Sequence, residues 1–101
     1  MILWVDDTRN PPNRFDYLWA STVRQAIMII EDEEQVGNPL EYLDLDHDAG
    51  DYFFGGGDYI RILDWLEETG RDYPIRIHSA NAVGRQNMRA IMKKNGWREV
   101  Y

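Results

Sequence analysis

The sequence predicts an α/β domain in which a parallel sheet of five strands is covered by helices on both faces. Short apolar segments without internal alternation, such as Ile2–Val5, are typical of strands buried on both sides. Segments with apolar residues at helical spacing follow most of these strands, and this alternation favours parallel pairing through right-handed crossovers. The expected strand order is 2-1-3-4-5. At 101 residues the chain is predicted to be a single domain, residues 1–101.

The first two strands are predicted at Ile2–Val5 and Tyr17–Ala20. Residues 8–14 contain two prolines, which cannot donate ladder hydrogen bonds and which disfavour a helix before them. The ten residues 6–15 that link the two strands are few for a crossover that carries a full helix. We therefore expect the first helix to be missing or vestigial.

A helix and a third strand follow. Ser21 or Thr22 is expected to cap a helix whose apolar residues recur from Val23 at i, i+3, i+4 and i+7, up to an acidic run. The third strand is predicted at Leu40–Asp46. The glycines at 55–57 do not have the spacing of a nucleotide-binding loop and are interpreted as a hinge or a flexible lid.

The last part of the chain repeats this alternation. Asp58 is expected to cap a helix that ends at Gly70, and a fourth strand is predicted at Ile75–Ser79. Arg76 within that strand indicates a sheet face that is incompletely covered. A final helix is expected to end at Gly96. A fifth strand is then predicted at residues 97–101.

Composition and charge exclude several function classes. The chain has no cysteine, so disulfides, a cysteine nucleophile and thiolate zinc sites are excluded. Its formal net charge of −7 argues against broad binding to DNA or RNA backbones. No apolar run approaches the roughly 18 residues of a membrane span, and the N-terminus does not resemble a signal peptide. We expect a cytoplasmic protein, and the oligomeric state stays open.

Polar residues gather at the predicted carboxyl ends of three strands. The clusters are Asp6 and Asp7; Asp46, His47 and Asp48; and His78, Ser79 and Asn81. In an open α/β sheet, ligands bind beyond the carboxyl ends of the strands, where the strand order reverses. We therefore expect the three clusters to converge on one site.

The acidic residues predict a cation site. Several carboxylates held together repel one another, and a bound cation is one remedy. Mg²⁺, or Mn²⁺ in its place, takes oxygen ligands and often shares them with phosphate, so Asp6, Asp7 and Asp46 are the candidate ligands. The alternative is that some of these residues only cap loops. Asp44 is interpreted as structural or solvated.

The remaining polar residues suggest acid–base chemistry and phosphate binding. His47 or His78 is a candidate general acid or base, with Asp48 as an orienting partner and with simple packing as the alternative. Ser79 and Asn81 either donate to phosphate oxygens or only form the turn after the fourth strand. Arg85 lies in the first turn of the last helix, where free backbone N–H groups favour an anion. A solvated helix face is its alternative.

Three segments together carry a resemblance to a known family. They are Leu3-Trp4-Val5-Asp6-Asp7-Thr8-Arg9 with Pro11-Pro12, Leu45-Asp46-His47-Asp48-Ala49-Gly50, and His78-Ser79-Ala80-Asn81-Ala82-Val83-Gly84-Arg85 with Asn87-Met88. Over nearly its whole length the chain resembles the cyclic-phosphate-processing receiver-like domain family. The resemblance implies a receiver-like (flavodoxin-like) three-layer sandwich and the processing of cyclic phosphates, on nucleotides or at RNA ends.

The resemblance also implies roles for individual residues. Asp6 and Asp7 match the acidic pair of receiver domains, Asp46 matches their phosphoacceptor, and Ser79 matches their hydroxyl after strand four. His47, Asp48, His78 and Asn81 match the residues that set this family apart. A signalling receiver would also have a lysine at the end of strand five, and residues 97–101 contain none.

Two functional hypotheses of different classes follow, with a third less favoured. The first is a metal-assisted phosphoesterase that opens a cyclic phosphate of a nucleotide, or a 2′,3′-cyclic RNA end. The second is a protein that binds or sequesters a phosphate-bearing ligand, such as a cyclic nucleotide, without turnover. A phosphoaccepting signalling receiver is third, because the lysine is absent. In each case the expected partner is a small phosphate-bearing molecule, and neither a membrane nor bulk DNA.

Overall fold

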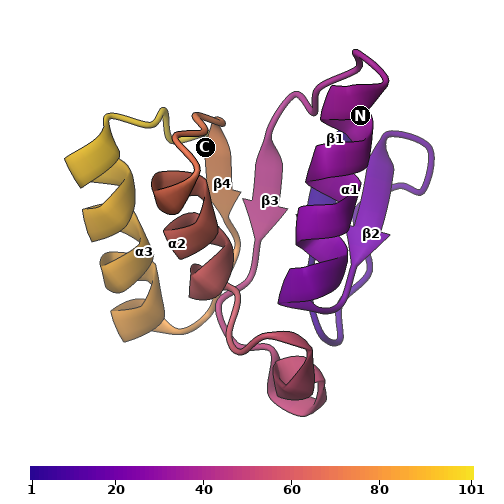
Figure 1. Ribbon diagram of the computed structural model, residues 1–101. Helices are drawn as coiled ribbons and strands as arrows, with labels where there is room; N and C mark the ends of the chain where they lie inside the picture. Colours follow the sequence, from indigo (N-terminus) through magenta and orange to yellow (C-terminus); the bar gives the residue numbers. More distant parts are fainter.

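The computed structural model describes residues 1–101 as a parallel sheet with helices packed on it (Figure 1). The strands are β1 (Ile2–Val5), β2 (Tyr17–Ala20), β3 (Leu43–Leu45) and β4 (Ile75–Ile77). The helices are α1 (Val23–Gln35), α2 (Ile60–Glu68) and α3 (Ala82–Asn95), with a 3-10 helix η1 (Gly50–Gly55). The strands pair in the order β2-β1-β3-β4, all parallel. The α/β class and this part of the strand order are confirmed.

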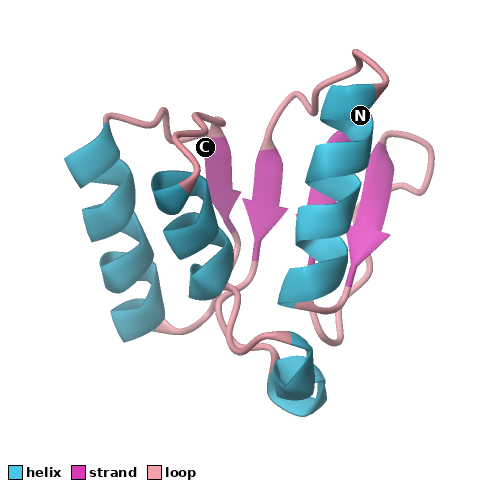
Figure 2. Ribbon diagram, viewed as in Figure 1, coloured by secondary structure: helices cyan, strands magenta, loops and turns pink.

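All three helices lie on the same face of the sheet, in front of the strands in Figures 1 and 2. Their buried residues join alternate strand residues, such as Leu3, Val5 and Leu43, in a core of 19 buried residues. Right-handed crossovers explain this arrangement, because the connections after β2, β3 and β4 cross the sheet in one direction and only the β1–β2 link crosses in the other. That link contains no helix, as predicted. The fold therefore has two layers where three were predicted.

The predicted fifth strand at residues 97–101 is not formed. Only one isolated parallel bridge, between Ile75 and Glu99, joins this segment to β4. The N–H of Ile75 donates to the carbonyl of Arg98, and the N–H of Val100 donates to the carbonyl of Ile75. Ile75 is thus the one residue of β4 that is paired with the segment 97–101.

The helix ends match the sequence in two places and differ in one. The Thr22 hydroxyl caps α1 by accepting a hydrogen bond from the N–H of Gln25 at 3.0 Å, and Gly96 ends α3 with a φ of 70°. Asp58 is not the cap of α2, which begins after Tyr59. The Asp58 carboxylate instead accepts a hydrogen bond from the N–H of Ala49 at 2.9 Å, and this bond closes the loop that contains η1.

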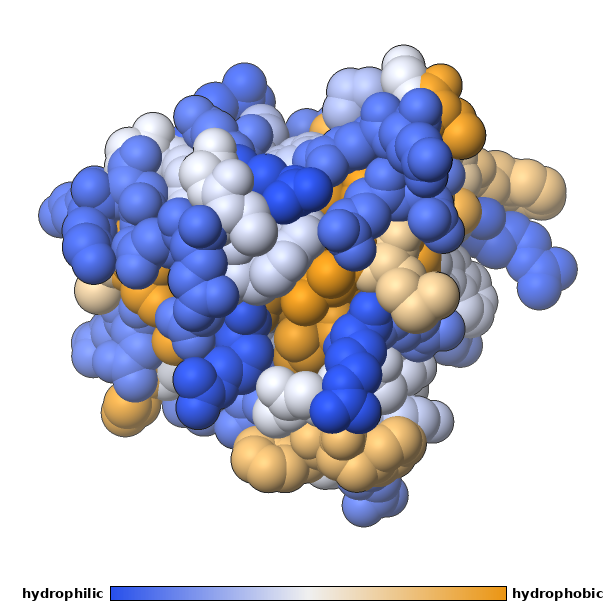
Figure 3. Space-filling model, in the orientation of Figure 1, coloured by the Kyte–Doolittle hydropathy of each residue, from blue (hydrophilic) through white to orange (hydrophobic).

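The glycine segment 55–57 has a packing role. Gly55 is buried, and a Cβ built on it would lie 2.4 Å from the Cβ of Thr22. Residues 50–55 form the 3-10 helix η1, so the first glycine of the segment lies in a helical turn. The side chains of Phe53 and Phe54 in η1 are exposed. Figure 3 shows an apolar patch at its lower edge, where η1 lies in Figure 1.

The face without helices carries aromatic and charged side chains. The strand register aligns Trp19, Trp4, Asp44 and Arg76 in one row across β2, β1, β3 and β4. Arg76 donates to the Asp44 carboxylate at 3.2 Å. The incompletely covered face that Arg76 predicted is thus confirmed. None of the helices has the length and apolar content needed to span a membrane.

Candidate functional site

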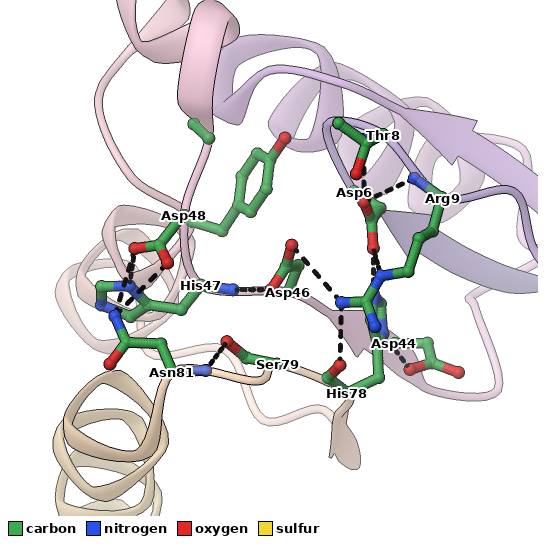
Figure 4. Close-up of polar contacts among 12 residues, drawn as sticks. Asp6, Thr8, Arg9, Asp44, Asp46, His47, Asp48, His78, Ser79 and Asn81 are labelled. Carbon is green, nitrogen blue, oxygen red and sulfur yellow. Dashed lines mark hydrogen bonds and ion pairs between the residues drawn. The ribbon is translucent and has the colours of Figure 1, made fainter.

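The three polar clusters meet at the carboxyl edge of the sheet (Figure 4). Asp6 follows β1, Asp46 and His47 follow β3, and His78 follows β4. Parallel strands place their carboxyl ends at one edge, so residues far apart in the sequence become neighbours. His78 and Asp6, 72 positions apart, are in direct hydrogen-bond contact. The predicted convergence is present.

Asp6 is a buried carboxylate with a full set of donors. One oxygen accepts hydrogen bonds from the backbone N–H groups of Thr8 and Arg9, both at 2.9 Å. The other oxygen accepts from Arg9 Nε at 3.2 Å and faces His78 Nε2 at 2.8 Å. Burial alone would raise the pKa of Asp6, but the donations from Arg9, Thr8 and His78 outweigh it and lower the pKa.

His78 forms a bridge between two buried carboxylates. Its Nδ1 lies 2.7 Å from Asp44 Oδ1, its Nε2 lies 2.8 Å from Asp6 Oδ2, and its ring stacks on Trp4 with centroids 4.0 Å apart. Both ring nitrogens of His78 are therefore engaged by carboxylates. In this geometry neither nitrogen is free for a substrate.

Arg9 is a site residue that the analysis of motifs did not single out. Its Nη2 donates to the carbonyl of His78 at 3.0 Å and lies 3.6 Å from Asp46 Oδ2, while its Nε holds Asp6. The guanidinium therefore links the ends of three strands and offsets part of their negative charge. The signal in the sequence was the position of Arg9, three residues after a buried aspartate.

Asp7 has no cationic partner, in contrast to Asp6. Asp7 forms no ion pair, and its carboxylate packs against Gly50, where an added Cβ would lie 2.5 Å from Asp7 Oδ2. Burial raises the pKa of Asp7, and the nearby Asp46 and Asp6 carboxylates raise it further. A group in this position is stabilised by a cation.

The carboxylates of Asp6, Asp7 and Asp46 fit a divalent cation in number and spacing. Each offers an oxygen, and the three oxygens lie within 4.8 Å of one another. Asp46 accepts from the N–H of His47 through Oδ1, at 2.8 Å, and Oδ2 has only the distant Arg9 contact. Hard oxygen ligands of this kind suit Mg²⁺ or Mn²⁺. Asp7 and Asp46 have the most freedom to bind it, because Asp6 is already fully hydrogen-bonded.

His47 differs from His78 in having one ring nitrogen free. His47 Nδ1 lies 2.8 Å from Asp48 Oδ1, and Asn81 Nδ2 donates to both oxygens of the same carboxylate at 3.3 Å. The contact with His47 is the main cause that lowers the pKa of Asp48. Nε2 has no hydrogen-bond partner within the chain, and the His47 side chain is 13% exposed. The His47 ring packs closely against Gly84, because a Cβ added at Gly84 would lie 2.5 Å from His47 Cγ.

The residues predicted to bind phosphate also make contacts within the fold. The Ser79 hydroxyl accepts from the N–H of Asn81 at 3.1 Å, and Asn81 Oδ1 caps α3 by accepting from the N–H of Gly84 at 2.9 Å. Arg85 Nη1 donates to the carbonyl of Ser79 at 2.7 Å. The turn that the sequence offered as an alternative for Ser79 and Asn81 is thus formed. Their phosphate-binding roles, and that of Arg85, stay predictions.

The parallel sheet with an acidic pair after β1 and an aspartate after β3 defines a receiver-like domain. The chain matches the model of the family described as the cyclic-phosphate processing receiver domain over residues 1–94. It belongs to that family, as the sequence segments indicated. No curated protein and no solved structure matches the chain.

Proposed function

We propose that this domain is a metal-assisted phosphoesterase that hydrolyses a cyclic phosphate to a phosphomonoester. The observation that carries the proposal is that only one of the two ring nitrogens of His47 is hydrogen-bonded. Its Nδ1 is held by Asp48, its Nε2 has no hydrogen-bond partner, and its backbone N–H donates to the Asp46 carboxylate. A histidine oriented through one nitrogen and free at the other has the geometry of a general base.

The cation would be held by Asp7 and Asp46, with Asp6 as the third carboxylate. When bound, it would supply positive charge to a phosphoryl oxygen and relieve the repulsion that raises the pKa of Asp7. The first turn of α3, beside Asp48, offers backbone N–H groups that favour an anion and supports the placement of the phosphate there.

The reaction needs one proton acceptor and one proton donor. His47 Nε2 takes a proton from a water molecule as the water oxygen bonds to phosphorus. One of the two ester P–O bonds breaks, and the leaving oxygen receives a proton, which the imidazolium of His47 can return. Because both nitrogens of His78 face carboxylates, we assign His78 to holding Asp6 in place. Asp48 orients His47.

A binding protein without turnover is the second candidate, and one observation favours it. Arg9 already offsets the charge of Asp6 and Asp46, and the side chains of Ser79, Asn81 and Arg85 are engaged within the fold. A site that is satisfied in this way can hold a phosphate-bearing ligand without reorganising. This candidate predicts stoichiometric binding and recovery of the intact ligand.

One assay separates the two candidates. The purified protein is incubated with Mg²⁺ or Mn²⁺ and a panel of 2′,3′-cyclic and 3′,5′-cyclic nucleotides, and both product and bound ligand are followed. We expect phosphomonoester formation that requires the metal and is lost in Asp46→Asn, while the matched variant Asp16→Asn, at the amino edge of the sheet, retains it. Tight binding with no product would contradict the esterase and support the binding protein.

A further inference from the structure

A hollow lies beside the cluster formed by Asp6, Asp7 and Asp46. It has a volume of about 200 Å³ and lies between the end of β2, the loop after β1 and the side chain of Tyr52 from η1. Asp6 and Asp7 form part of its wall, and Trp19 and Tyr52 are among its aromatic lining residues. The hollow therefore shares Asp6 and Asp7 with the proposed cation site.

Trp19 is a large aromatic side chain that stays half-exposed on the edge of the sheet. It lies on the edge strand β2, opposite Trp4 in the register, and it is 45% exposed because no helix covers that face. Trp4, its neighbour in the same row, is 7% exposed and is stacked on His78. Tyr52, on the other side of the hollow, is 37% exposed. Two half-exposed aromatic rings thus flank the same opening.

The lining of this hollow suits an aromatic ring, because it includes the side chains of Trp19 and Tyr52. Ligand pockets for whole small molecules measure about 300–1,000 Å³, so this hollow holds only a part of such a molecule. Aromatic side chains bind nucleobases by stacking, which tolerates different bases because each base has a π-face. The Asp7 carboxylate at the wall can accept a hydrogen bond from an exocyclic amino group of a base.

We propose that the hollow formed by Trp19 and Tyr52 is a base-binding subsite, so that the substrate class is a nucleoside cyclic phosphate and not a base-free sugar phosphate. This inference rests on the proposed function, because it places the phosphate of the same molecule at Asp7, Asp46 and His47. The net charge of −7 argues against contacts along a long RNA backbone. The subsite therefore binds the base of one nucleotide, either a free nucleotide or the one at the 3′ end of an RNA.

The test compares substrates with and without a base in four proteins. They are the wild type, Trp19→Leu, which keeps apolar bulk but removes the ring, Trp19→Phe, which keeps a ring, and Phe15→Leu, which removes an exposed aromatic ring just before β2 at the opposite edge of the sheet. Each is assayed in Mg²⁺ with adenosine 2′,3′-cyclic phosphate and with glycerol 1,2-cyclic phosphate. An oligoribonucleotide that ends in a 2′,3′-cyclic phosphate distinguishes an RNA end from a free nucleotide.

We expect Trp19→Leu to raise KM for adenosine 2′,3′-cyclic phosphate by about 5-fold to 100-fold, as the loss of one stacking contact implies. The values for glycerol 1,2-cyclic phosphate should not change, Trp19→Phe should recover most of the loss, and Phe15→Leu should behave as the wild type. Equal effects of Trp19→Leu on both substrates, or no effect on either, would overturn the subsite. So would a wild type that prefers the glycerol compound.

Binding measured without turnover separates this inference from the proposed function. Calorimetric titration with adenosine 3′-monophosphate and with glycerol phosphate needs no catalysis. If no substrate is hydrolysed but the adenosine compound still binds, and binds about 5-fold or more weakly to Trp19→Leu, the subsite stands and the esterase fails. If turnover occurs but the Trp19 variants bind the adenosine compound as the wild type does, the esterase stands and the subsite fails.

Discussion

The two halves of the site each contain a histidine beside an aspartate, and they differ in how many ring nitrogens of the histidine are hydrogen-bonded. In the closed half, His78 lies between Asp6 and Asp44 with both ring nitrogens in hydrogen-bond contact, and its side chain is 7% exposed. In the open half, His47 is held only through Nδ1, by Asp48. A histidine next to an aspartate is therefore not in itself a catalytic pair. The number of nitrogens already bonded decides between a structural bridge and a proton acceptor.

The surroundings of each histidine explain this difference. His78 follows β4 on the helix-free face, where the row of strand residues places Asp44 on one side and Trp4 beneath the ring. His47 follows β3, and its ring packs against Gly84 at the start of α3. The closed half thus packs on the helix-free face of the sheet, while the open half lies between a strand end and a helix.

The largest expected effect on stability belongs to the closed half. His78→Ala removes the hydrogen bonds that its ring shares with Asp6 and Asp44, and each hydrogen bond to a charged group contributes about 1.5–3 kcal/mol. Thermal unfolding should show a decrease in Tm of about 12 °C or more. His47→Ala is the matched variant, and because its partner Asp48 is exposed we expect a loss of only about 1 kcal/mol. Equal losses for the two variants would contradict the distinction between the halves.

The next effect concerns the support of His47. Gly84→Ala places a Cβ where the His47 ring lies, and overpacking of this kind costs about 1–3 kcal/mol. Elsewhere in a helix, replacing glycine by alanine stabilises by about 0.5–1 kcal/mol. The test is therefore whether Gly84→Ala raises or lowers the free energy of unfolding, measured by chemical denaturation. We expect destabilisation together with reduced turnover, and a more stable protein with unchanged turnover would show that Gly84 does not position the ring.

The smallest effect concerns Asp7, the carboxylate of the proposed cation site that has no cationic partner. The pKa of Asp7 is raised in the folded state, so ionised Asp7 lowers stability as pH rises through that pKa. Asp7→Asn should therefore stabilise the metal-free protein at pH 7, by up to about 1 kcal/mol. The difference should vanish below the ordinary aspartate pKa of about 3.9, where Asp7 is protonated in both states.

Mg²⁺ provides the complementary measurement at the same residue. It should raise the Tm of the wild type by binding the folded state, and it should raise that of Asp7→Asn less. Asp16→Asn, which lies outside the cluster, is the control and should respond as the wild type. An Asp7→Asn protein that is less stable than the wild type in the absence of metal would contradict the repulsion between Asp7, Asp46 and Asp6.

Much of the fold and the membership of the site could be predicted from the sequence. Apolar runs such as Ile2–Val5 end in polar residues, and parallel strands bring those residues to one edge. The missing first helix followed from the length of the β1–β2 link. The absence of that helix leaves one face of the sheet uncovered. The sequence indicated this only in part, through Arg76, because the face that each helix covers depends on the direction of its crossover.

The bonding within the site could not be predicted in the same way. The sequence placed His47 and His78 in equivalent positions after two strands, and nothing local shows that Asp44 lies beside His78. That contact depends on the register of β3 against β4. Arg9 was likewise hidden, because its contact with Asp46 joins two loops that are distant in sequence.

The most direct test of the account is the turnover of adenosine 2′,3′-cyclic phosphate in Mg²⁺ by the wild type and by His47→Ala, with the folded state of both checked by circular dichroism. The account predicts that His47→Ala remains folded and that kcat falls by about 10²-fold to 10⁴-fold, as expected when a general base is lost. A folded His47→Ala protein with the turnover of the wild type would contradict the assignment of His47 as the proton acceptor.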